Sequence, residues 1–348
     1  MRVVVVQTTA DEMKIALCPH LSLEHYRGGE KWTTTLANRL AADGFDVAVR
    51  ALPYTPRDER RVAATDVLDD SVSYRERWHH NLSGFDSAYL FYHPFARSFF
   101  TGETRAIAGI HSWVYLTKQL YEPHYGIVPT TAKLLYRALG KHAFDRFDAV
   151  HTVTDSYTSP HQNTHYIPNF VDTSLFRPTE STREEPFTVL VTAAQLRSKG
   201  WDRTRAIAAT LADELRVVTT GDSDHPAIEG LGFLDEGALA DAYANAHAVL
   251  HPTRIDADSL VIKEALAAGT PVVTTPLRTH PPEGAAVLHG STVGNLVARL
   301  RTLRWEWSHD SGYERRCRSA RQVGERHSFE TVYPQLKALL TTSEQADG

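Results

Sequence analysis

Apolar residues recur along this chain in short runs, each followed by a turn and then by an amphipathic stretch. This rhythm is typical of repeated βα units around a parallel sheet. In the first half it predicts strands over residues 13–18, 45–49, 87–92, 106–110 and 149–153. Residues 3–6 are a rival to the first of these strands or an additional strand. Trp32, Leu36 and Leu40 recur at i, i+4 and i+8, which predicts a helix over 30–43 with one buried face, ended by Gly44.

A second series of the same kind begins near residue 187. Its predicted strands cover 187–192, 216–220, 247–251 and 271–275. Its predicted helices cover 203–215, 238–246 and 259–268. The segment 177–186 between the two series is polar, charged and bounded by prolines, as expected of a linker. The pattern therefore predicts two α/β domains.

Composition narrows the class of protein. The 348 residues are 42% hydrophobic and 23% charged, which allows a core in each half. The formal net charge of -5 argues against a nucleic-acid binder. Cys18 and Cys317 are too few for a disulfide framework or a cysteine-based zinc site. No run of about 18 apolar residues occurs, and the apolar stretch in 1–7 is too short for a secretion signal, so we expect a cytoplasmic protein.

Four segments carry candidate chemistry. In chain order they are Gly28-Gly29-Glu30; Ile167-Pro168-Asn169-Phe170-Val171-Asp172 with Phe176-Arg177-Pro178; Lys199-Gly200-Trp201-Asp202; and His251-Pro252-Thr253 followed by Asp256, Glu264 and Gly269-Thr270-Pro271. Their order and spacing resemble glycosyltransferase family 4 over residues 13–340, although each segment alone is a weak signal.

The resemblance implies the GT-B fold, with two Rossmann-like doubly wound domains facing across a cleft. It implies an N-terminal acceptor domain over 1–176 and a nucleotide-sugar donor domain over 177–328. A C-terminal helix within 329–348 is expected to pack back on the N-terminal domain. The implied reaction moves a sugar from a nucleoside-diphosphate sugar to a hydroxyl with retention at the anomeric carbon, in glycan or glycolipid biosynthesis.

The chain departs from the family pattern at two places. The family usually has two glutamates separated by seven residues, whereas this chain has Asp256 and Glu264. The family's Gly-Arg-Leu ahead of the Lys-Gly pair is replaced by residues 194–196, Ala-Gln-Leu. The expected arginine is therefore missing, and Arg197 is the candidate to replace it.

The pyrophosphate of a nucleotide-sugar needs fixed positive charge and backbone N–H donors. Asp258 or Ser259 can cap the helix predicted over 259–268. The start of that helix then offers an anion site formed by the N–H groups of Ser259, Leu260 and Val261. Lys199 follows another strand, at the edge where open α/β sheets bind ligands, and suits a phosphate as a point charge.

Asp256 lies before this helix, and Glu264 lies about one and a half turns inside it. The family assigns the first carboxylate to sugar hydroxyls and the second to the ribose. Spacing alone favours a turn-forming Asp256 and a solvated Glu264, but the four segments together favour the site. Gly221 ends a predicted strand either as a simple turn or, as the family implies, beside the nucleotide.

Two features of the N-terminal half have alternative interpretations. Gly28 and Gly29 precede the predicted helix, either as a turn with positive φ or as a close approach of the backbone to a diphosphate or acceptor. His111 follows the run 106–110 and, by the resemblance, approaches the donor sugar. His93 ends the preceding predicted strand and is the rival.

Other catalytic classes lack their motifs. The eighteen histidines include no His-Glu-x-x-His helix, and His161 and His165 lie in a polar loop without partners. Neither a phosphate-binding Gly-x-x-x-x-Gly-Lys loop nor a Gly-x-Ser-x-Gly elbow occurs. We therefore expect no metal and no cofactor, since the nucleotide-sugar is itself a substrate.

Aromatic and basic residues interleave over 97–141. We prefer core aromatics beside a solvated face, but a surface for acidic lipid or a lipid-linked acceptor stays open, with the protein at the inner face of the membrane. The arginine-rich stretch 315–326 is expected to be a solvated helix. Other classes also remain open: an inverting transferase, a nucleotide-sugar epimerase or a non-catalytic partner subunit of the same fold.

Overall fold

The computed structural model describes residues 13–55, 60–111, 138, 143–156, 159, 161–179, 183–309 and 312–342. The described residues form two compact units: unit 1 holds those up to Pro168 and from Tyr333 onward, and unit 2 holds Asn169–Val332. The division precedes the expected boundary at residue 176, because Val171 and Phe176 are buried in the core of unit 2. The alternative strand at 3–6 and most of the aromatic and basic stretch lie outside the described residues.

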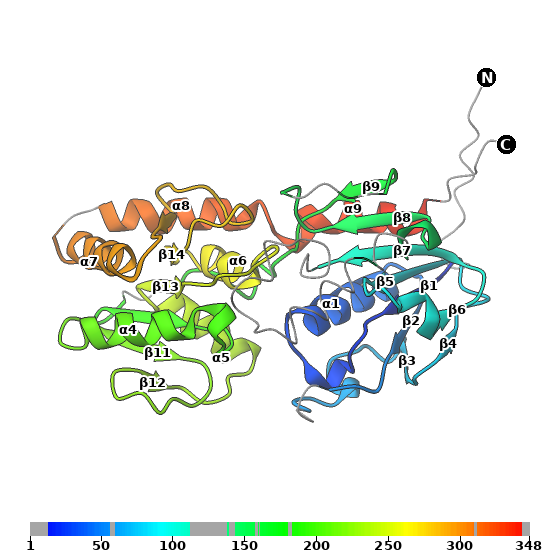
Figure 1. Ribbon diagram of the computed structural model, residues 1–348, viewed down its shortest axis with the longest axis horizontal. Coiled ribbons are helices and arrows are strands. Elements are labelled where there is room, and N and C mark those ends of the chain that lie inside the picture. The colour runs from blue at the N-terminus through cyan, green and yellow to red at the C-terminus, as the bar shows by residue number, and fades with distance from the viewer. Residues whose placement is uncertain are drawn as a thin grey trace, which may run out of the picture. The chain divides into compact units, whose positions relative to one another are not determined.

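Unit 1 is built on a parallel sheet in the order β3-β2-β1-β5-β7-β8-β9 (Figure 1). Its strands are β1 (Lys14–Cys18), β2 (Asp46–Ala51), β3 (Ser73–Glu76), β5 (Ser87–Phe91), β7 (Arg105–Ile110), β8 (Ala149–Thr152) and β9 (Thr164–Tyr166). The five strands predicted from 13 to 153 are confirmed. The sequence did not predict β3 and β9, because these edge strands are polar and contain no buried residue.

Helix α1 (Gly28–Ala42) buries Trp32, Leu36 and Leu40, as its spacing predicts. It begins earlier than expected. Gly28 and Gly29 are its first residues and do not precede it, and neither has a positive φ, so the turn alternative is excluded. The helix can start there because the buried carboxylate of Glu30 accepts from the backbone N–H of Arg27 at 2.9 Å.

Short elements complete unit 1. They are η2 (Leu23–His25), η4 (Ala64–Asp66), β4 (His80–Asn81), α2 (Ala96–Phe99), β6 (Phe100–Thr101) and η7 (Phe144–Arg146), with β4 and β6 paired in parallel.

Unit 2 has a parallel sheet in the order β12-β11-β10-β13-β14-β15. The strands are β10 (Thr188–Val191), β11 (Arg216–Thr219), β12 (Glu229–Gly230), β13 (Ala248–His251), β14 (Val272–Thr274) and β15 (Val287–His289). In each unit the sheet runs outward from a central strand in both directions, which is the doubly wound order. The strand order reverses between β1 and β5 and between β10 and β13.

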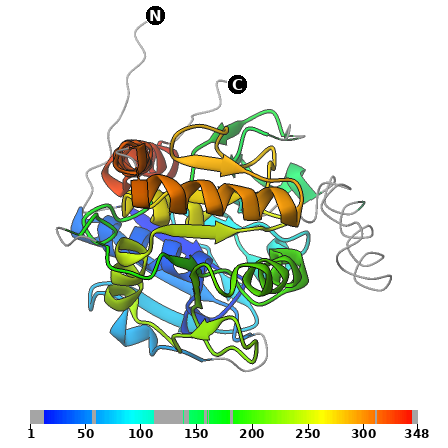
Figure 2. The same cartoon turned by 90° about the vertical axis from the view of Figure 1, so that its left-hand side faces the viewer.

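Helices cover both faces of the unit 2 sheet (Figures 1 and 2). The helices are α4 (Trp201–Leu211), α5 (Glu236–Asn245), α6 (Leu260–Ala267), α7 (Val293–His309) and α8 (Gly312–Glu325). One core cluster joins α5, α6 and α8 to strand residues such as Leu190 and Val249. The other joins α4 and α7 to Val189 and Leu250, the alternate strand positions. The three helices predicted in this half are confirmed.

The last two helices cover the arginine-rich stretch and the range predicted for the C-terminal helix. In α8, Arg321 donates to the Ala267 carbonyl at 2.7 Å and Arg316 pairs with Glu306, so this helix is not simply solvated. Helix α9 (Phe329–Thr341) matches the range expected for the C-terminal helix. In unit 1, Tyr333 and Lys337 of α9 each bind the carboxylate of Asp43 at 2.6 Å. No helix in the described part of the chain is long and apolar enough to cross a membrane.

Candidate functional site

The strand order of unit 2 reverses between β10 and β13, and open α/β sheets bind ligands at the carboxyl ends of strands at such a point. The loop after β10 contains η8 (Arg197–Lys199) and Gly200. The loop after β13 runs through residues 252–259 to the start of α6. Two of the four sequence segments therefore meet at this edge.

Gly200 allows these two loops to touch. It has φ +82°, and a Cβ on it would lie 2.2 Å from the Pro252 carbonyl oxygen. Only glycine satisfies both conditions, since it has no Cβ and tolerates positive φ. Arg254 adds a second link, because its guanidinium binds both carboxylate oxygens of Asp202 at 2.6 and 2.7 Å. The sequence interpretation missed this ion pair.

Lys199 and Asp256 meet where the loops pack together. The Lys199 ammonium lies 3.6 Å from Asp256 Oδ1 and donates to the Ile255 carbonyl at 3.2 Å. On the other side, His251 Nε2 lies 2.7 Å from Asp256 Oδ2. Burial opposes ionisation of Asp256, but Lys199 and His251 outweigh it and hold the pKa of this carboxyl well below its usual range. The site therefore holds a largely buried carboxylate that stays charged beside a cation.

His280 is a further member of this cluster that sequence reasoning missed. Its Nδ1 lies 2.8 Å from the Thr275 carbonyl oxygen, which only accepts, so Nδ1 is protonated. Nε2 lies 3.9 Å from Asp256 Oδ2. Ligand atoms of His251, Asp256 and His280 lie within 4.8 Å of one another, a spacing that suits a metal ion.

No sequence motif contains this triad, because His280 lies far from the other two residues in the sequence. Lys199 already compensates the charge of Asp256. A divalent cation at the triad would have to bind beside that ammonium.

The start of α6 is capped by Ser259, whose Oγ accepts from the N–H of Ile262 at 3.4 Å. Asp258, the alternative cap, has another role. Its carboxylate accepts from the backbone N–H of Asn169 at 2.6 Å and pairs with the buried Lys263. Leu260 and Val261, which follow the cap, are partly exposed. Both residues belong to the first turn of α6, so their N–H groups lie at the helix start, where an anion is favoured.

Glu264 is held at the same sheet edge by a tyrosine that the sequence interpretation did not single out. Tyr243 of α5 is buried, and its hydroxyl lies 2.7 Å from Thr192 Oγ1, directly after β10. Burial raises the pKa of Tyr243 well above its usual value, and the hydrogen-bonded carboxylate of Glu264 adds to this effect. Glu264 is therefore a partly buried, hydrogen-bonded carboxylate rather than a solvated helix residue.

Gly221 and Arg197 flank this cluster. Gly221 follows β11 with φ +81° and donates its N–H to the Gly232 carbonyl at 2.7 Å. A Cβ on Gly221 would meet nothing within 4 Å, so its backbone conformation alone accounts for glycine there. The side chain of Arg197 is exposed, and its carbonyl accepts from Arg254 at 2.6 Å.

In unit 1, His111 directly follows β7, at the carboxyl end of the sheet as predicted. Its ring stacks on Phe91 at a centroid distance of 4.4 Å and lies edge-on to Trp32 at 4.6 Å. The rival His93 follows the neighbouring strand β5 and is partly buried, which lowers its pKa. Gly29 lies in ordinary contact with Phe91, at 3.4 Å for a Cβ built on it.

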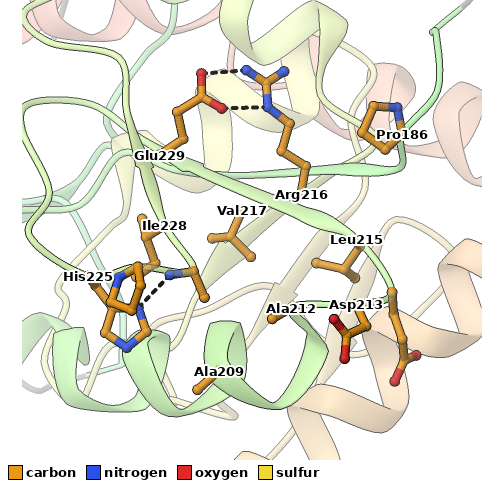
Figure 3. Close-up of a pocket in the computed structure, with 13 residues that line it drawn as sticks. Pro186, Ala209, Ala212, Asp213, Leu215, Arg216, Val217, His225, Ile228 and Glu229 are labelled. Atoms are coloured by element: carbon orange, nitrogen blue, oxygen red, sulfur yellow. Dashed lines mark hydrogen bonds and ion pairs between the residues drawn. The ribbon is translucent and has the colours of Figure 1, made fainter.

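The structure also contains a pocket of about 790 Å³ elsewhere in unit 2 (Figure 3). Its lining includes Pro186, Leu215 and Arg216, which precede or begin β10 and β11. Arg216 forms a bidentate ion pair with Glu229 at its rim. The pocket therefore lies at the amino ends of these strands, opposite the edge that holds Lys199 and Asp256.

Comparisons with known proteins relate part of the sequence to a family and the whole fold to solved structures. Residues 187–303 match the family described as Glycosyl transferases group 1. No curated protein matches the sequence.

Among solved structures, sucrose-phosphate synthase from Thermosynechococcus elongatus is 17% identical, with a TM-score of 0.69 over 94% of this chain and 98% of its own. HepE from Anabaena, solved with UDP and glucose, is 12% identical, with a TM-score of 0.72 over 94% and 99% of the two chains. WaaG, a glycosyltransferase involved in lipopolysaccharide biosynthesis, is 13% identical, with a TM-score of 0.69 over 94% and 100%. The predicted GT-B fold, with two Rossmann-like domains, is confirmed, and the family match falls within unit 2.

Proposed function

We propose that this protein is a retaining glycosyltransferase of family 4 that moves a sugar from a nucleoside-diphosphate sugar to a hydroxyl. The observation that carries the proposal is the meeting of Lys199, Asp256 and the start of α6 at the point where the unit 2 sheet reverses its strand order. The group 1 match over 187–303 covers these residues.

The pyrophosphate is the leaving group, and negative charge develops on it as the sugar departs. Lys199 and the N–H groups at the α6 start (Ser259, Leu260, Val261) would bind this charge. The exposed Arg197 can extend towards the same phosphate, in place of the family's missing arginine. In this proposal the reaction needs no metal, because Lys199 already provides the cation beside Asp256.

The two carboxylates would bind hydroxyl groups. Asp256 is held charged and oriented by His251, which suits a residue that accepts from sugar hydroxyls. Glu264 is held by Tyr243 beside the end of β10, which suits the ribose. Gly221, after β11, would lie beside the nucleotide, as in the family.

Unit 1 would supply His111 to the donor sugar and bind the acceptor, with Gly28 and Gly29 at the start of α1. We propose a glycan or lipid-linked acceptor. Aromatic and basic residues over 97–141 motivate the lipid-linked form and contact with the inner face of a membrane, although most of them lie outside the described residues.

Binding of nucleotides by unit 2 is the first test. We expect UDP, the nucleotide bound in the HepE structure, or another nucleoside diphosphate to raise the melting temperature by mass action. Glu264→Ala should weaken calorimetric affinity for that nucleotide more than Glu264→Gln, which keeps one acceptor. Glu283→Ala removes an exposed carboxylate paired with Arg299 and serves as the control. Equal affinities for all variants would exclude Glu264 from the nucleotide site.

The reaction itself is tested with donor and a panel of hydroxyl acceptors in the presence of a chelator. We expect transfer, and proton NMR of the first product should show the anomeric configuration of the donor. Inversion would contradict retention, and loss of activity with the chelator would contradict the metal-free proposal. Epimerisation of the donor without acceptor, or tight binding without turnover, would favour the alternative classes.

A further inference from the structure

Three polar side chains form a hydrogen-bonded chain on one face of the unit 1 sheet. Tyr89 on β5 places its hydroxyl 2.8 Å from His111 Nε2 and 2.5 Å from His151 Nδ1 on β8. His151 Nε2 in turn lies 2.7 Å from the Ile167 carbonyl oxygen. Tyr89 and His151 are fully buried, so the bonds from Tyr89 to His151 and from His151 to Ile167 are protected from water.

Gly109 makes this chain possible. It lies on β7, between the strands of Tyr89 and His151, and pairs with His151 in register. A Cβ on Gly109 would lie 2.1 Å from the Tyr89 hydroxyl oxygen. The tyrosine side chain can therefore cross β7 to reach His151 only because position 109 has no side chain.

The Ile167 carbonyl, at one end of these linked hydrogen bonds, determines the direction of each of them. A carbonyl oxygen only accepts, so His151 Nε2 must be protonated towards Ile167. Burial lowers the pKa of His151 to about 4, so the ring is neutral near pH 7 and its Nδ1 is an acceptor. Tyr89 then donates its only proton to His151 Nδ1. Its oxygen is left to accept, and the donor is His111 Nε2–H.

We propose that Tyr89 and His151 are positioning residues that hold His111 with its Nε2 protonated towards the Tyr89 oxygen, so that the ring is fixed in one orientation for its contact with the donor sugar. This inference rests on the proposed role of His111 in sugar transfer. Trp32 of α1, which is buried, stacks over the His151 ring at 6.3 Å and covers the chain from the helix side.

The tautomer is tested first, without any assay of activity. Ring nitrogen-15 NMR of histidine-labelled protein distinguishes protonated from unprotonated Nδ1 and Nε2. The loss of peaks in His111→Gln and His151→Asn assigns the two rings. We expect both to carry the proton on Nε2 near neutral pH. In Tyr89→Phe, His151 should keep its tautomer, because Ile167 still accepts, while the His111 shifts should move towards a mixture of tautomers.

Kinetics then separate positioning from a purely structural role. Tyr89→Phe should lower kcat roughly tenfold, the effect of losing about one hydrogen bond, with the donor KM changed less than about twofold. Tyr313→Phe is the matched control, because its buried hydroxyl donates to the His247 carbonyl at 2.7 Å within unit 2. His151→Asn, which keeps an acceptor and a donor, should retain most of kcat, whereas His151→Leu should not.

The outcomes distinguish this inference from the proposed function. A wild-type His111 protonated on Nδ1 alone, or a Tyr89→Phe variant with unchanged His111 shifts and unchanged kcat, would overturn the positioning role. A wild-type protein with the expected tautomers that transfers no sugar to any acceptor would instead overturn the proposed function.

Discussion

At the scale of single residues, the candidate site depends on the position of the Lys199 ammonium. Lys199 is partly exposed and contacts Asp256, whose pKa is held well below its usual range although burial opposes this. The ammonium thus keeps Asp256 charged and would also face the departing pyrophosphate. Both effects would be lost together if the ammonium were removed.

We expect Lys199→Ala to lower kcat on the order of 100-fold, because such a group supplies about 3 kcal/mol to the transition state. Donor affinity should fall much less. Lys14→Ala, which removes an exposed lysine paired with Asp46 in unit 1, is the control. A Lys199→Ala enzyme within a few-fold of wild type would place Lys199 outside the site, and a silent Arg197→Ala would show that the missing family arginine has no replacement.

At the scale of elements, two loops and one helix start are held together by contacts that involve a backbone atom or a buried charge. Gly200 lets the loop after β10 approach Pro252. Asp258, Lys263 and Asn169 join the segment at the beginning of unit 2 to α6. These contacts set the position of the candidate-site loops, so changes there should affect both stability and activity.

Gly200→Ala is predicted to destabilise the protein more than Gly232→Ala. Both glycines have positive φ, which costs roughly 1–2 kcal/mol for another residue. Only at Gly200 would the new Cβ also clash, at 2.2 Å from the Pro252 oxygen. Urea denaturation of both variants measures the difference. Equal losses of stability would mean that the contact with Pro252 relaxes freely, and that the two loops are not held by it.

Lys263→Met should lower the free energy of unfolding by roughly 3–5 kcal/mol, because it leaves the largely enclosed carboxylate of Asp258 without its cation. Burial already raises the pKa of Asp258 despite Lys263. Adding Asp258→Asn to Lys263→Met should recover part of the loss, since no unpaired charge then remains. If the double variant were as unstable as the sum of the two single variants, the ion pair would not be the cause.

At the scale of the whole molecule, buried neutral histidines in both units connect stability to pH. Burial lowers the pKa of His20, His151, His247 and His327 from 6.5 to about 4. Between these values the unfolded chain binds protons that the folded chain excludes. Stability contributed by these histidines is therefore complete above about pH 6.5 and is lost as the pH falls towards 4.

We expect the free energy of unfolding, measured in urea at several pH values, to fall steadily from pH 6.5 to 4. His151→Asn should reduce the slope over this interval, because one excluded proton is removed. Thr302→Ala, at an exposed position on α7 without an ionisable side chain, should leave the slope unchanged. A stability that is flat over this range would mean that these rings accept protons in the folded protein.

Much of the fold follows from local burial alone. Alternating apolar runs and i, i+4 spacing predicted thirteen elements in the two series, from the strand at 13–18 to the strand at 271–275, because the spacing of apolar residues along the chain decides which face of an element is buried. Polar edge strands such as β3 and β9 escaped prediction, because they bury little. Gly28 and Gly29 were placed outside α1, because glycine is a weak signal at a helix start and the buried Glu30 cap was not visible in the sequence.

The sequence by itself determined the two βα series, the GT-B resemblance and the segments that carry Lys199, Asp256 and Glu264. Only the tertiary structure decided which side chains meet. The contact of Lys199 with Asp256, the addition of His280 and the chain from His111 through Tyr89 to His151 all join residues far apart in sequence. Such contacts depend on the order of the strands in each sheet and on how closely the backbone approaches other groups, as at Gly109 and Gly200. The spacing of apolar residues along the sequence reveals neither the strand order nor these close approaches.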